Sequence, residues 1–334
     1  MLYTEFGAGG LKSSVLGFGC APLLGRAGKR ESLRALSAAY ECGITFYDTA
    51  RSYGYGECEA LLGEFLRGKR DRVLVSTKFG IVPAKQNLLK QIAKPLIRGA
   101  LHAVPSARKL VQKGIRGEFQ EGQFTVAVLQ QSIAESLRKL QTDYVDILFL
   151  HAAPAHVLEQ GDVLREMEKL IQAGRVRMAG LSADPDVIET ALERRPRPLS
   201  AMQFPCNVFD LSMTQRIASA SSSGFGFAAN HPFGGVRRVA ETRQSLREIA
   251  NSRETPAELR EKLGSVDDRV LAEVVLNVIT QGTGIQVVIP AMVRPEHLRA
   301  NAEAVLNSRF SAGEIQWLRS RLSGVAQLAE RIAN

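Results

Sequence analysis

Apolar residues along the chain gather in short continuous runs instead of alternating with polar residues. Such runs are typical of parallel strands that are covered on both faces. Segments with helical periodicity lie between them, such as 125–141, where Leu129, Ile133, Leu137 and Leu140 share one face. Eight runs predict strands, at residues 14–21, 44–50, 73–80, 145–151, 176–182, 199–207, 224–230 and 284–291.

Helix boundary signals support this alternation of strands and helices. Asp184 precedes Pro185 at the expected start of a helix, as a polar cap followed by proline commonly does. The helical segment 267–282 ends at Gly282, a residue type common just past a helix. Strands joined by helices, with no linker that divides the chain, predict an α/β fold: one (β/α)8 TIM-barrel domain over residues 1–334.

An open, doubly wound α/β sheet is the alternative arrangement. Its first strand would be followed by a glycine-rich turn that binds phosphate. Gly17 and Gly19 match the first two glycines of that pattern, but Pro22 stands at the third, and no acidic residue follows at the expected distance. The sequence therefore favours the barrel.

Two segments are insertions in the barrel pattern, 81–124 after the third strand and 231–256 after the seventh. In a barrel, the loops that follow strands form the active-site face. Most of the net charge of +9 comes from eight cations in 81–117, a segment without Asp or Glu: Lys85, Lys90, Lys94, Arg98, Arg108, Lys109, Lys113 and Arg116. Because the rest of the chain is nearly neutral, we expect no nucleic-acid partner.

The pattern of residues 87–104 resembles an amphipathic helix interrupted by Pro95. Three interpretations are open for this basic insertion. It is a helical cover of the barrel mouth, a lid whose positive field attracts an anionic substrate or the cofactor pyrophosphate, or a contact with a membrane surface or another subunit. Its position directly after the third strand favours the first two, so we expect it to border the substrate pocket.

Composition narrows the class of protein. With 45% hydrophobic and 23% charged residues, the chain is typical of a soluble globular protein. We expect no stable membrane insertion and a cytoplasmic location, because no apolar run is long enough to span a bilayer and the first residues lack a secretion-signal pattern. Cys20, Cys42, Cys58 and Cys206 lack metal-ligand spacing, so we expect reduced thiols and no metal.

Candidate chemistry lies at the carboxyl ends of three successive strands. Asp48 ends the second strand, Tyr53 follows it in a short loop, Lys78 lies near the end of the third, and His151 ends the fourth. A phenol can give and take a proton, a nearby ammonium lowers its pKa, and Asp48 balances that ammonium. His151 is placed to hold a substrate carbonyl oxygen. No side chain supplies a hydride, so this set predicts a nicotinamide cofactor.

These motifs together resemble the aldo-keto reductase family. Residues 47–66, "YDTARSYGYGECEALLGEFL", are similar to its Asp-Thr-Ala…Tyr-Gly signature, "VSTKFG" to its lysine strand and "DILFLH" to its histidine strand. "GLS", "MQFPCN" and "VVIPAMVRPEHLRAN" resemble its later cofactor-binding strands. The resemblance implies that Tyr53 is the general acid/base, tuned by Asp48 and Lys78, and that His151 orients a carbonyl. It implies NAD(P)-dependent reduction of an aldehyde or ketone to an alcohol, or the reverse.

The resemblance also implies a set of cofactor contacts, at Ser182, Gln203, Asn230, Pro232, Arg294, His297 and Asn301. Ala183 stands where the family commonly has an amide beside Ser182, and Asn230 where it has an aromatic residue. NADP(H) is favoured over NAD(H), with Arg294 as the candidate partner of the 2′-phosphate.

The expected substrate is a small carbonyl compound or a sugar. The single tryptophan, Trp317, lies near the C-terminus, so we expect the pocket to be lined by Phe18, Tyr55, Phe79 and Phe233. Two alternatives stay open, an aldose 1-dehydrogenase on the same fold and a cofactor-binding regulatory subunit with slow turnover. We expect a monomer or a small homo-oligomer.

Overall fold

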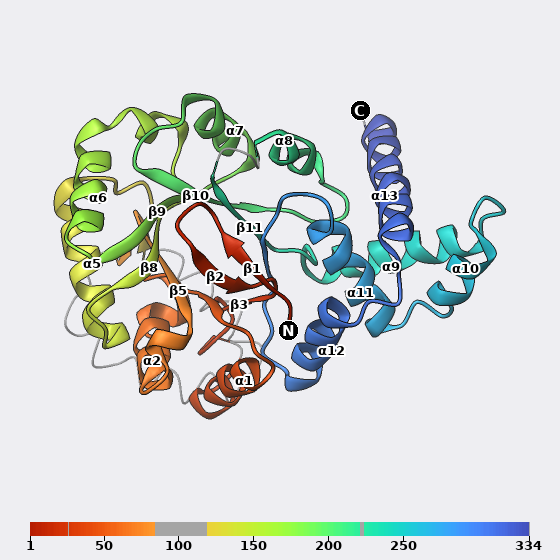
Figure 1. The fold of residues 1–334 in the computed structure, drawn as a ribbon, viewed down its shortest axis with the longest axis horizontal. Coiled ribbons are helices and arrows are strands. Elements are labelled where there is room, and N and C mark those ends of the chain that lie inside the picture. The colour runs from red at the N-terminus through yellow and green to blue at the C-terminus, as the bar shows by residue number, and fades with distance from the viewer. Residues whose placement is uncertain (26, 84–118, 221–223, 334) are drawn as a thin grey trace.

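The computed structural model describes residues 1–25, 27–83, 119–220 and 224–333. Within them, the eight expected strands pair in parallel in one sheet, in the order β12-β11-β10-β9-β8-β5-β4-β3 (Figure 1). Their bounds are β3 (Gly17–Gly19), β4 (Phe46–Asp48), β5 (Leu74–Phe79), β8 (Val145–His151), β9 (Val176–Ser182), β10 (Leu199–Pro205), β11 (Gly226–Asn230) and β12 (Val287–Ile289).

The two edge strands of this sheet meet and close it into a barrel. Leu16, just before β3, pairs in parallel with Val288 of β12. The backbone N–H of Val288 donates to the carbonyl of Val15 at 2.9 Å, and that of Gly19 donates to the carbonyl of Pro290 at 3.1 Å. The predicted (β/α)8 barrel is therefore confirmed.

Helices surround the barrel (Figure 1): α1 (Lys29–Glu41), α2 (Cys58–Leu66), α5 (Val126–Leu140), α6 (Gly161–Gln172), α7 (Pro185–Arg194), α8 (Ser212–Ala220), α11 (Asp268–Thr280) and α12 (Pro295–Leu306). The local sequence explains their starts. The hydroxyl of Thr125 accepts a hydrogen bond from the Val128 N–H at 3.2 Å at the start of α5, and Asp267 does the same for Val270 at 2.8 Å in α11. Short 3₁₀ turns are η1 (Tyr53–Gly56), η2 (Arg70–Arg72) and η3 (Ala155–Glu159).

An antiparallel hairpin, β1 (Tyr3–Phe6) and β2 (Leu11–Ser14), lies across one end of the barrel (Figure 1). The sequence analysis did not predict it. Phe6 and Leu11 pack into the inner core of the barrel, beside Phe46 and Leu74. The hairpin thus closes the end of the barrel opposite to the carboxyl ends of the strands.

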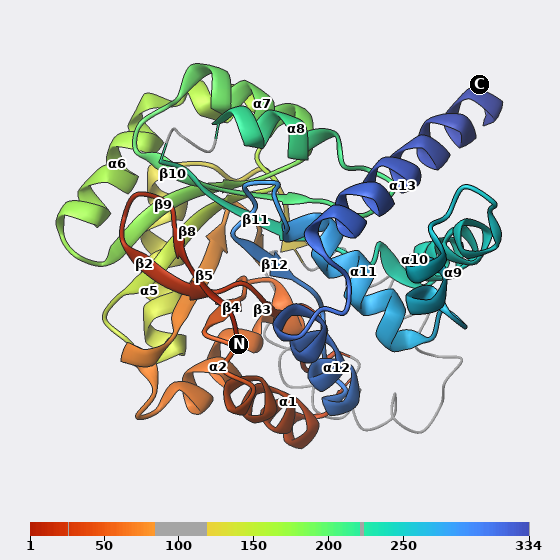
Figure 2. The same cartoon turned by 45° about the vertical axis from the view of Figure 1, so that its right-hand side comes forward.

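Both insertions follow the strands from which they were predicted. The second contains two helices, α9 (Gly235–Asn251) and α10 (Ala257–Leu263), which lie outside the ring near the long terminal helix α13 (Ala312–Ala333) (Figures 1 and 2). The first begins and ends in a short ribbon of β6 (Val82–Pro83) and β7 (Phe119–Gln120), directly beyond β5. The predicted amphipathic pattern at 87–104 and the eight cations lie outside the described residues. Within the described part of the chain, no helix is long and apolar enough to cross a membrane.

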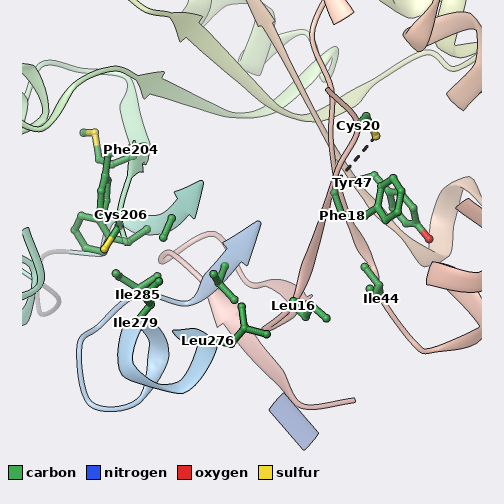
Figure 3. Close-up of a cluster of buried hydrophobic side chains, with 14 of the residues drawn as sticks. Leu16, Phe18, Cys20, Ile44, Tyr47, Phe204, Cys206, Leu276, Ile279 and Ile285 are labelled. Carbon is green, nitrogen blue, oxygen red and sulfur yellow. Dashed lines mark hydrogen bonds between the residues drawn. The ribbon is translucent and has the colours of Figure 1, made fainter. Parts of the chain in front are cut away.

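Alternate residues of each barrel strand face either the barrel interior or the helices. The inner layer includes Phe46, Ile147, Phe149, Ala201 and Ala228, together with Met178, Val287 and Ile289. The outer layer fills the space between strands and helices. Figure 3 shows part of it, with the rings of Phe18 and Tyr47 at a centroid distance of 5.9 Å.

Candidate active site

A layer of polar residues lies directly above the inner apolar core, at the carboxyl ends of the strands. Asp48 comes two residues after Phe46, His151 after Phe149, Gln203 after Ala201 and Asn230 after Ala228. In the same way, Lys78 comes two residues after Ser76, and Ser182 two residues after Gly180. Because residues two apart share a face of a strand, these side chains all face the barrel axis. Strand alternation alone therefore assembles the polar layer.

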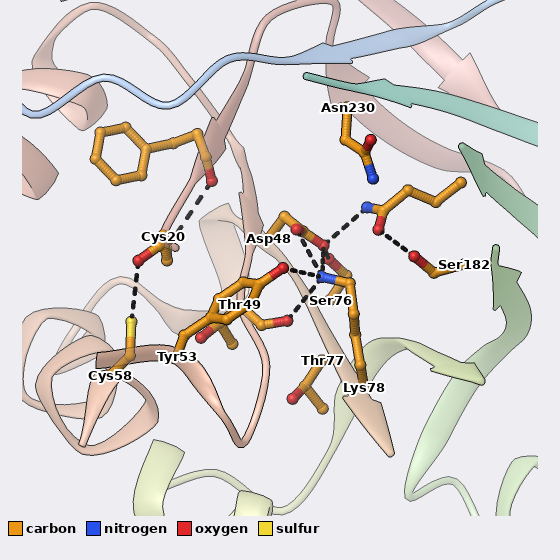
Figure 4. A network of polar contacts seen from close by, with 12 residues as sticks. Cys20, Asp48, Thr49, Tyr53, Cys58, Ser76, Thr77, Lys78, Ser182 and Asn230 are labelled. Carbon is orange, nitrogen blue, oxygen red and sulfur yellow. Dashed lines mark hydrogen bonds and ion pairs between the residues drawn. The ribbon is translucent and has the colours of Figure 1, made fainter. Parts of the chain in front are cut away.

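Lys78 and Asp48 form the centre of this layer (Figure 4). The Nζ of Lys78 lies 2.7 Å from Oδ1 and 2.6 Å from Oδ2 of Asp48. The same ammonium donates to the carbonyl of Thr49 at 3.0 Å and to the Tyr53 hydroxyl at 3.5 Å. Three neighbours thus accept the three N–H groups of the lysine.

The loop after β4 carries Tyr53 back over this ion pair. Gly54 and Gly56 have φ values of 56° and 86°, a left-handed conformation that glycine adopts without strain. A Cβ at Gly54 would also come within 3.0 Å of the Leu23 carbonyl. The ring of His151 meets that of Tyr53 edge-on, with centroids 6.1 Å apart and an interplanar angle of 84°. The four predicted catalytic residues therefore lie together.

Burial and charge set the protonation of this group. Burial alone would lower the pKa of Lys78, but the charge of Asp48 and the hydroxyl of Tyr53 outweigh it, so the pKa lies above its usual value. Burial raises the pKa of Tyr53, and the opposing effect of Lys78 does not cancel it. Lys78 thus lowers the Tyr53 pKa as expected, but burial outweighs this effect and the net shift of the pKa is upward. The phenol stays protonated at neutral pH and can act as a proton donor.

His151 is a neutral imidazole in this site. Burial, and to a lesser extent the charge of Lys78, lower its pKa from the ordinary value of 6.5 to about 3. A neutral ring has one N–H donor and one acceptor nitrogen. His151 can therefore donate a hydrogen bond to a carbonyl oxygen, but it does not serve as an acid at neutral pH.

Two predicted cofactor contacts are joined to the catalytic group. The Ser182 hydroxyl donates to Oε1 of Gln203 at 2.7 Å, and Nε2 of Gln203 donates to Oδ1 of Asp48 at 2.9 Å. Asn230 lies beside them at the end of β11 (Figure 4), and its Oδ1 is 2.8 Å from Nδ1 of His231. The sequence analysis missed one member, Ser76, although its position two residues before Lys78 places it on the same face.

The other predicted cofactor contacts lie in the segments after β11 and β12. Pro232 is buried, and Phe233 is half-buried against the outer core. Arg294 precedes the first turn of α12, and both it and His297 are exposed. Asn301 lies on the buried face of that helix. The structure does not bring these residues into contact with the catalytic group.

Two of the four predicted pocket residues are in the wrong place for that role. Phe18 is fully buried in the outer layer beside Tyr47, whose hydroxyl donates to the carbonyl of Leu36 in α1. Phe79 is fully buried against Phe124, with ring centroids 5.9 Å apart. Each directly neighbours an inward-facing residue, so strand alternation turns it toward the helices. Tyr55 is half-buried in η1 and, like Phe233, stays a candidate.

The described residues offer no group of three or more His, Cys, Asp or Glu side chains that could hold a metal. The set at the barrel mouth consists instead of a buried ion pair, a protonated phenol and a neutral imidazole. It has the means to donate a proton and to hold an oxygen atom that gains negative charge.

Comparison with known proteins agrees with the resemblance found in the sequence. The model of the Aldo/keto reductase family matches residues 15–321. The chain is 25% identical over 223 residues to the aldo-keto reductase YhdN of Bacillus subtilis (strain 168), which covers 65% of this chain and 57% of that protein. It is 33% identical over 196 residues to D-threo-aldose 1-dehydrogenase of a Pseudomonas species, which covers 57% of this chain and 55% of that protein. The chain thus spans little more than half the length of these two relatives.

The fold is also found in solved structures. The holo form of an aldo-keto reductase from Bacillus halodurans matches with a TM-score of 0.71 and 22% identity, over 96% of each chain. A thermostable aldo-keto reductase, Tm1743, solved with the inhibitor epalrestat, matches with a TM-score of 0.68 and 24% identity, over 96% of this chain and 100% of that one. At these identities the likeness concerns the fold.

Proposed function

Because the chain belongs to the aldo/keto reductase family, we propose that it is an NAD(P)H-dependent oxidoreductase that reduces an aldehyde or ketone to an alcohol, or catalyses the reverse reaction. The observation that carries the proposal is the contact chain Asp48–Lys78–Tyr53, with His151 edge-on to the phenol. A protonated phenol beside a buried ammonium is suited to protonate a carbonyl oxygen.

The residues present fit a nicotinamide adenine dinucleotide phosphate. Ser182, Gln203 and Asn230 provide amide and hydroxyl groups next to the catalytic group for a carboxamide. Gly234 and Gly235, with φ values of 61° and 87°, lead into the 17-residue helix α9, whose N-terminus is a favourable place for a phosphate. Arg294 is exposed at the start of α12 and is the candidate partner of a 2′-phosphate. This supports NADP(H) over NAD(H).

When bound, the nicotinamide supplies the hydride. The chain itself supplies the rest of the chemistry. The N–H of neutral His151 and the hydroxyl of Tyr53 hold the carbonyl oxygen, and Tyr53 gives it a proton as negative charge develops. Lys78 stabilises the phenolate that is left, and Asp48 keeps Lys78 charged.

A second candidate is oxidation of the anomeric carbon of a sugar by the same residues. It is favoured by the relative named D-threo-aldose 1-dehydrogenase and by another named L-galactose dehydrogenase, from Arabidopsis thaliana. Both reactions use Tyr53. In the oxidation it acts as the phenolate, which Lys78 stabilises, and takes up the proton of the sugar hydroxyl. A single barrel domain, a cytoplasmic location and a monomeric or small oligomeric state remain part of the proposal.

The direct test is to mix the purified protein with NADPH or NADH and a panel of aldehydes and ketones, and in parallel with NADP⁺ or NAD⁺ and a panel of aldoses. We expect substrate-dependent change in the absorbance of the reduced nicotinamide. Cofactor binding, measured by fluorescence quenching, without turnover on any panel would instead support the regulatory subunit. Failure to bind either cofactor would overturn the proposal.

A further inference from the structure

One oxygen of Asp48 accepts hydrogen bonds from two neutral side chains in addition to Lys78. The Ser76 hydroxyl donates to Oδ1 at 2.7 Å, and Nε2 of Gln203 donates to the same atom at 2.9 Å. Both donors are fully buried. Ser76 belongs to β5, next to Asp48, whereas Gln203 reaches it from β10 across the barrel. The carboxylate is therefore held from two sides.

The orientation of the Gln203 amide is set by a further contact. The Ser182 hydroxyl donates to its carbonyl oxygen at 2.7 Å, which turns the NH₂ group toward Asp48. Ser182 itself comes from β9. The hold on Asp48 thus depends on side chains from three strands besides its own.

This hold determines where the ammonium of Lys78 points. With Oδ1 fixed, both carboxylate oxygens lie within hydrogen-bond distance of Nζ, and the remaining N–H groups face Thr49 and Tyr53. A carboxylate free to rotate would let the ammonium turn away from the phenol. We propose that Ser76 and Gln203 are positioning residues, which fix the carboxylate of Asp48 so that the Lys78 ammonium is aimed at the Tyr53 hydroxyl. The inference rests on the proposed role of Tyr53 as proton donor.

Electrostatics gives the direction of the effect. The charge of Asp48 raises the pKa of Tyr53, and that of Lys78 lowers it. The two donors place the positive ends of their dipoles on Oδ1 and so offset part of the negative charge of Asp48. Loss of either donor makes Tyr53 a weaker acid for two reasons. The negative charge of Asp48 is then less offset, and the ammonium of Lys78 is less well directed toward the Tyr53 hydroxyl.

The test uses Ser76→Ala and Gln203→Met, two near-isosteric changes that each remove one donor. The first measurement is the pH titration of the Cζ resonance of isotope-labelled Tyr53, assigned by its loss in Tyr53→Phe. The second is kcat and KM against pH with the best substrate. We expect the Tyr53 transition to move to higher pH in both variants. In Ser76→Ala, kcat at neutral pH should fall about tenfold, the scale of one hydrogen bond to a charged group, while KM changes less. Gln203→Met is judged by the Tyr53 resonance of the protein without cofactor, because Gln203 is also a proposed cofactor contact.

Two further variants separate positioning from simple support of the fold. Thr77→Val removes a buried hydroxyl from the same strand, but that hydroxyl faces outward and donates to Glu59 at 2.7 Å. It is expected to lower the melting temperature without moving the Tyr53 titration or kcat. Ser76→Thr keeps the hydroxyl, so its Tyr53 titration and its kcat are expected to stay close to those of the wild type.

The inference is overturned if Ser76→Ala and Gln203→Met fold, by circular dichroism, and leave the Tyr53 resonance and kcat as in the wild type. If the wild type turns over no substrate, the proposed function fails. The Tyr53 resonance still tests the positioning in that case, because it needs no substrate.

Discussion

The side chains of Lys78 and Asp48 are only 1% and 5% exposed, and their charged groups lie 2.6 Å apart. Two unit charges in so dry a place are stable only as a pair, because each alone would have lost its hydration without compensation. Removal of one partner should therefore destabilise the fold more than removal of both, whereas the proposed chemistry needs both partners.

We predict that Asp48→Asn and Lys78→Met each lower the free energy of unfolding by about 3–5 kcal/mol, since each leaves one buried charge unpaired. The double variant should lose less than the sum, because it contains neither charge. Activity should be lost in all three. Urea unfolding provides the measurement, and additive losses in the double variant would mean that the two groups do not form a pair in solution.

Tyr53→Phe should leave stability and cofactor affinity nearly unchanged and lower kcat at least about a hundredfold, the usual scale of general acid catalysis. The change keeps the ring against His151 and removes only the hydroxyl at 3.5 Å from Lys78. Tyr47→Phe is the matched control, because its hydroxyl faces α1. A Tyr53→Phe variant that keeps most of its turnover would exclude this residue as the acid.

The eight strands and the clustering of Asp48, Tyr53, Lys78 and His151 could be predicted because each depends on local pattern. Continuous apolar runs show where parallel strands lie, and the ends of such strands meet at one rim of a barrel. The hairpin at residues 3–14 was missed because its strands have only four residues each and mix polar with apolar positions.

The errors at the site have a different origin. Phe79 directly follows Lys78, so the two cannot share a face of β5, and strand alternation would have excluded it from the pocket. The same rule would have found Ser76. By contrast, the contact from Gln203 to Asp48 crosses the barrel and joins residues 155 positions apart. No periodicity contains that information, because it depends on the width of the closed barrel.

Gly180 provides a test of packing just below the catalytic layer. A Cβ at this position would come within 2.5 Å of the Phe149 ring and 2.7 Å of the Ala201 carbonyl. Gly180→Ala is therefore expected to lower the free energy of unfolding by about 1–3 kcal/mol, as overpacking of a core does. Gly313→Ala, on α13 with open space around it, is the control for the substitution itself. Equal stability of the two variants would show that the side chains around Gly180 can move to accept a methyl group at little cost.

The half-buried imidazole of His151 makes stability depend on pH. Its pKa in the folded protein is about 3, below the ordinary value of 6.5 that the unfolded chain keeps. Between these values the unfolded state binds a proton that the folded state does not, so His151 lowers stability as pH falls from about 6.5 toward 3. His151→Gln should show a shallower loss of unfolding free energy between pH 7 and about pH 4.5 than the wild type. His297→Gln, which removes an exposed imidazole, is the control, and parallel curves for wild type and His151→Gln would contradict the burial of a neutral ring.

Cofactor choice can be tested at Arg294, the exposed arginine that precedes α12. A guanidinium can bind a 2′-phosphate with two parallel hydrogen bonds, and NADH lacks that group. Arg294→Ala should raise the Kd for NADPH about tenfold, a loss of roughly 1.4 kcal/mol in binding free energy. The Kd for NADH should stay unchanged. Arg299→Ala is the matched control, because this arginine is also exposed but lies farther along the same helix. Fluorescence titration with both cofactors measures two constants for each of the three proteins, the wild type and the two variants. Equal weakening of NADPH and NADH by Arg294→Ala, or none, would remove this residue from the phosphate site.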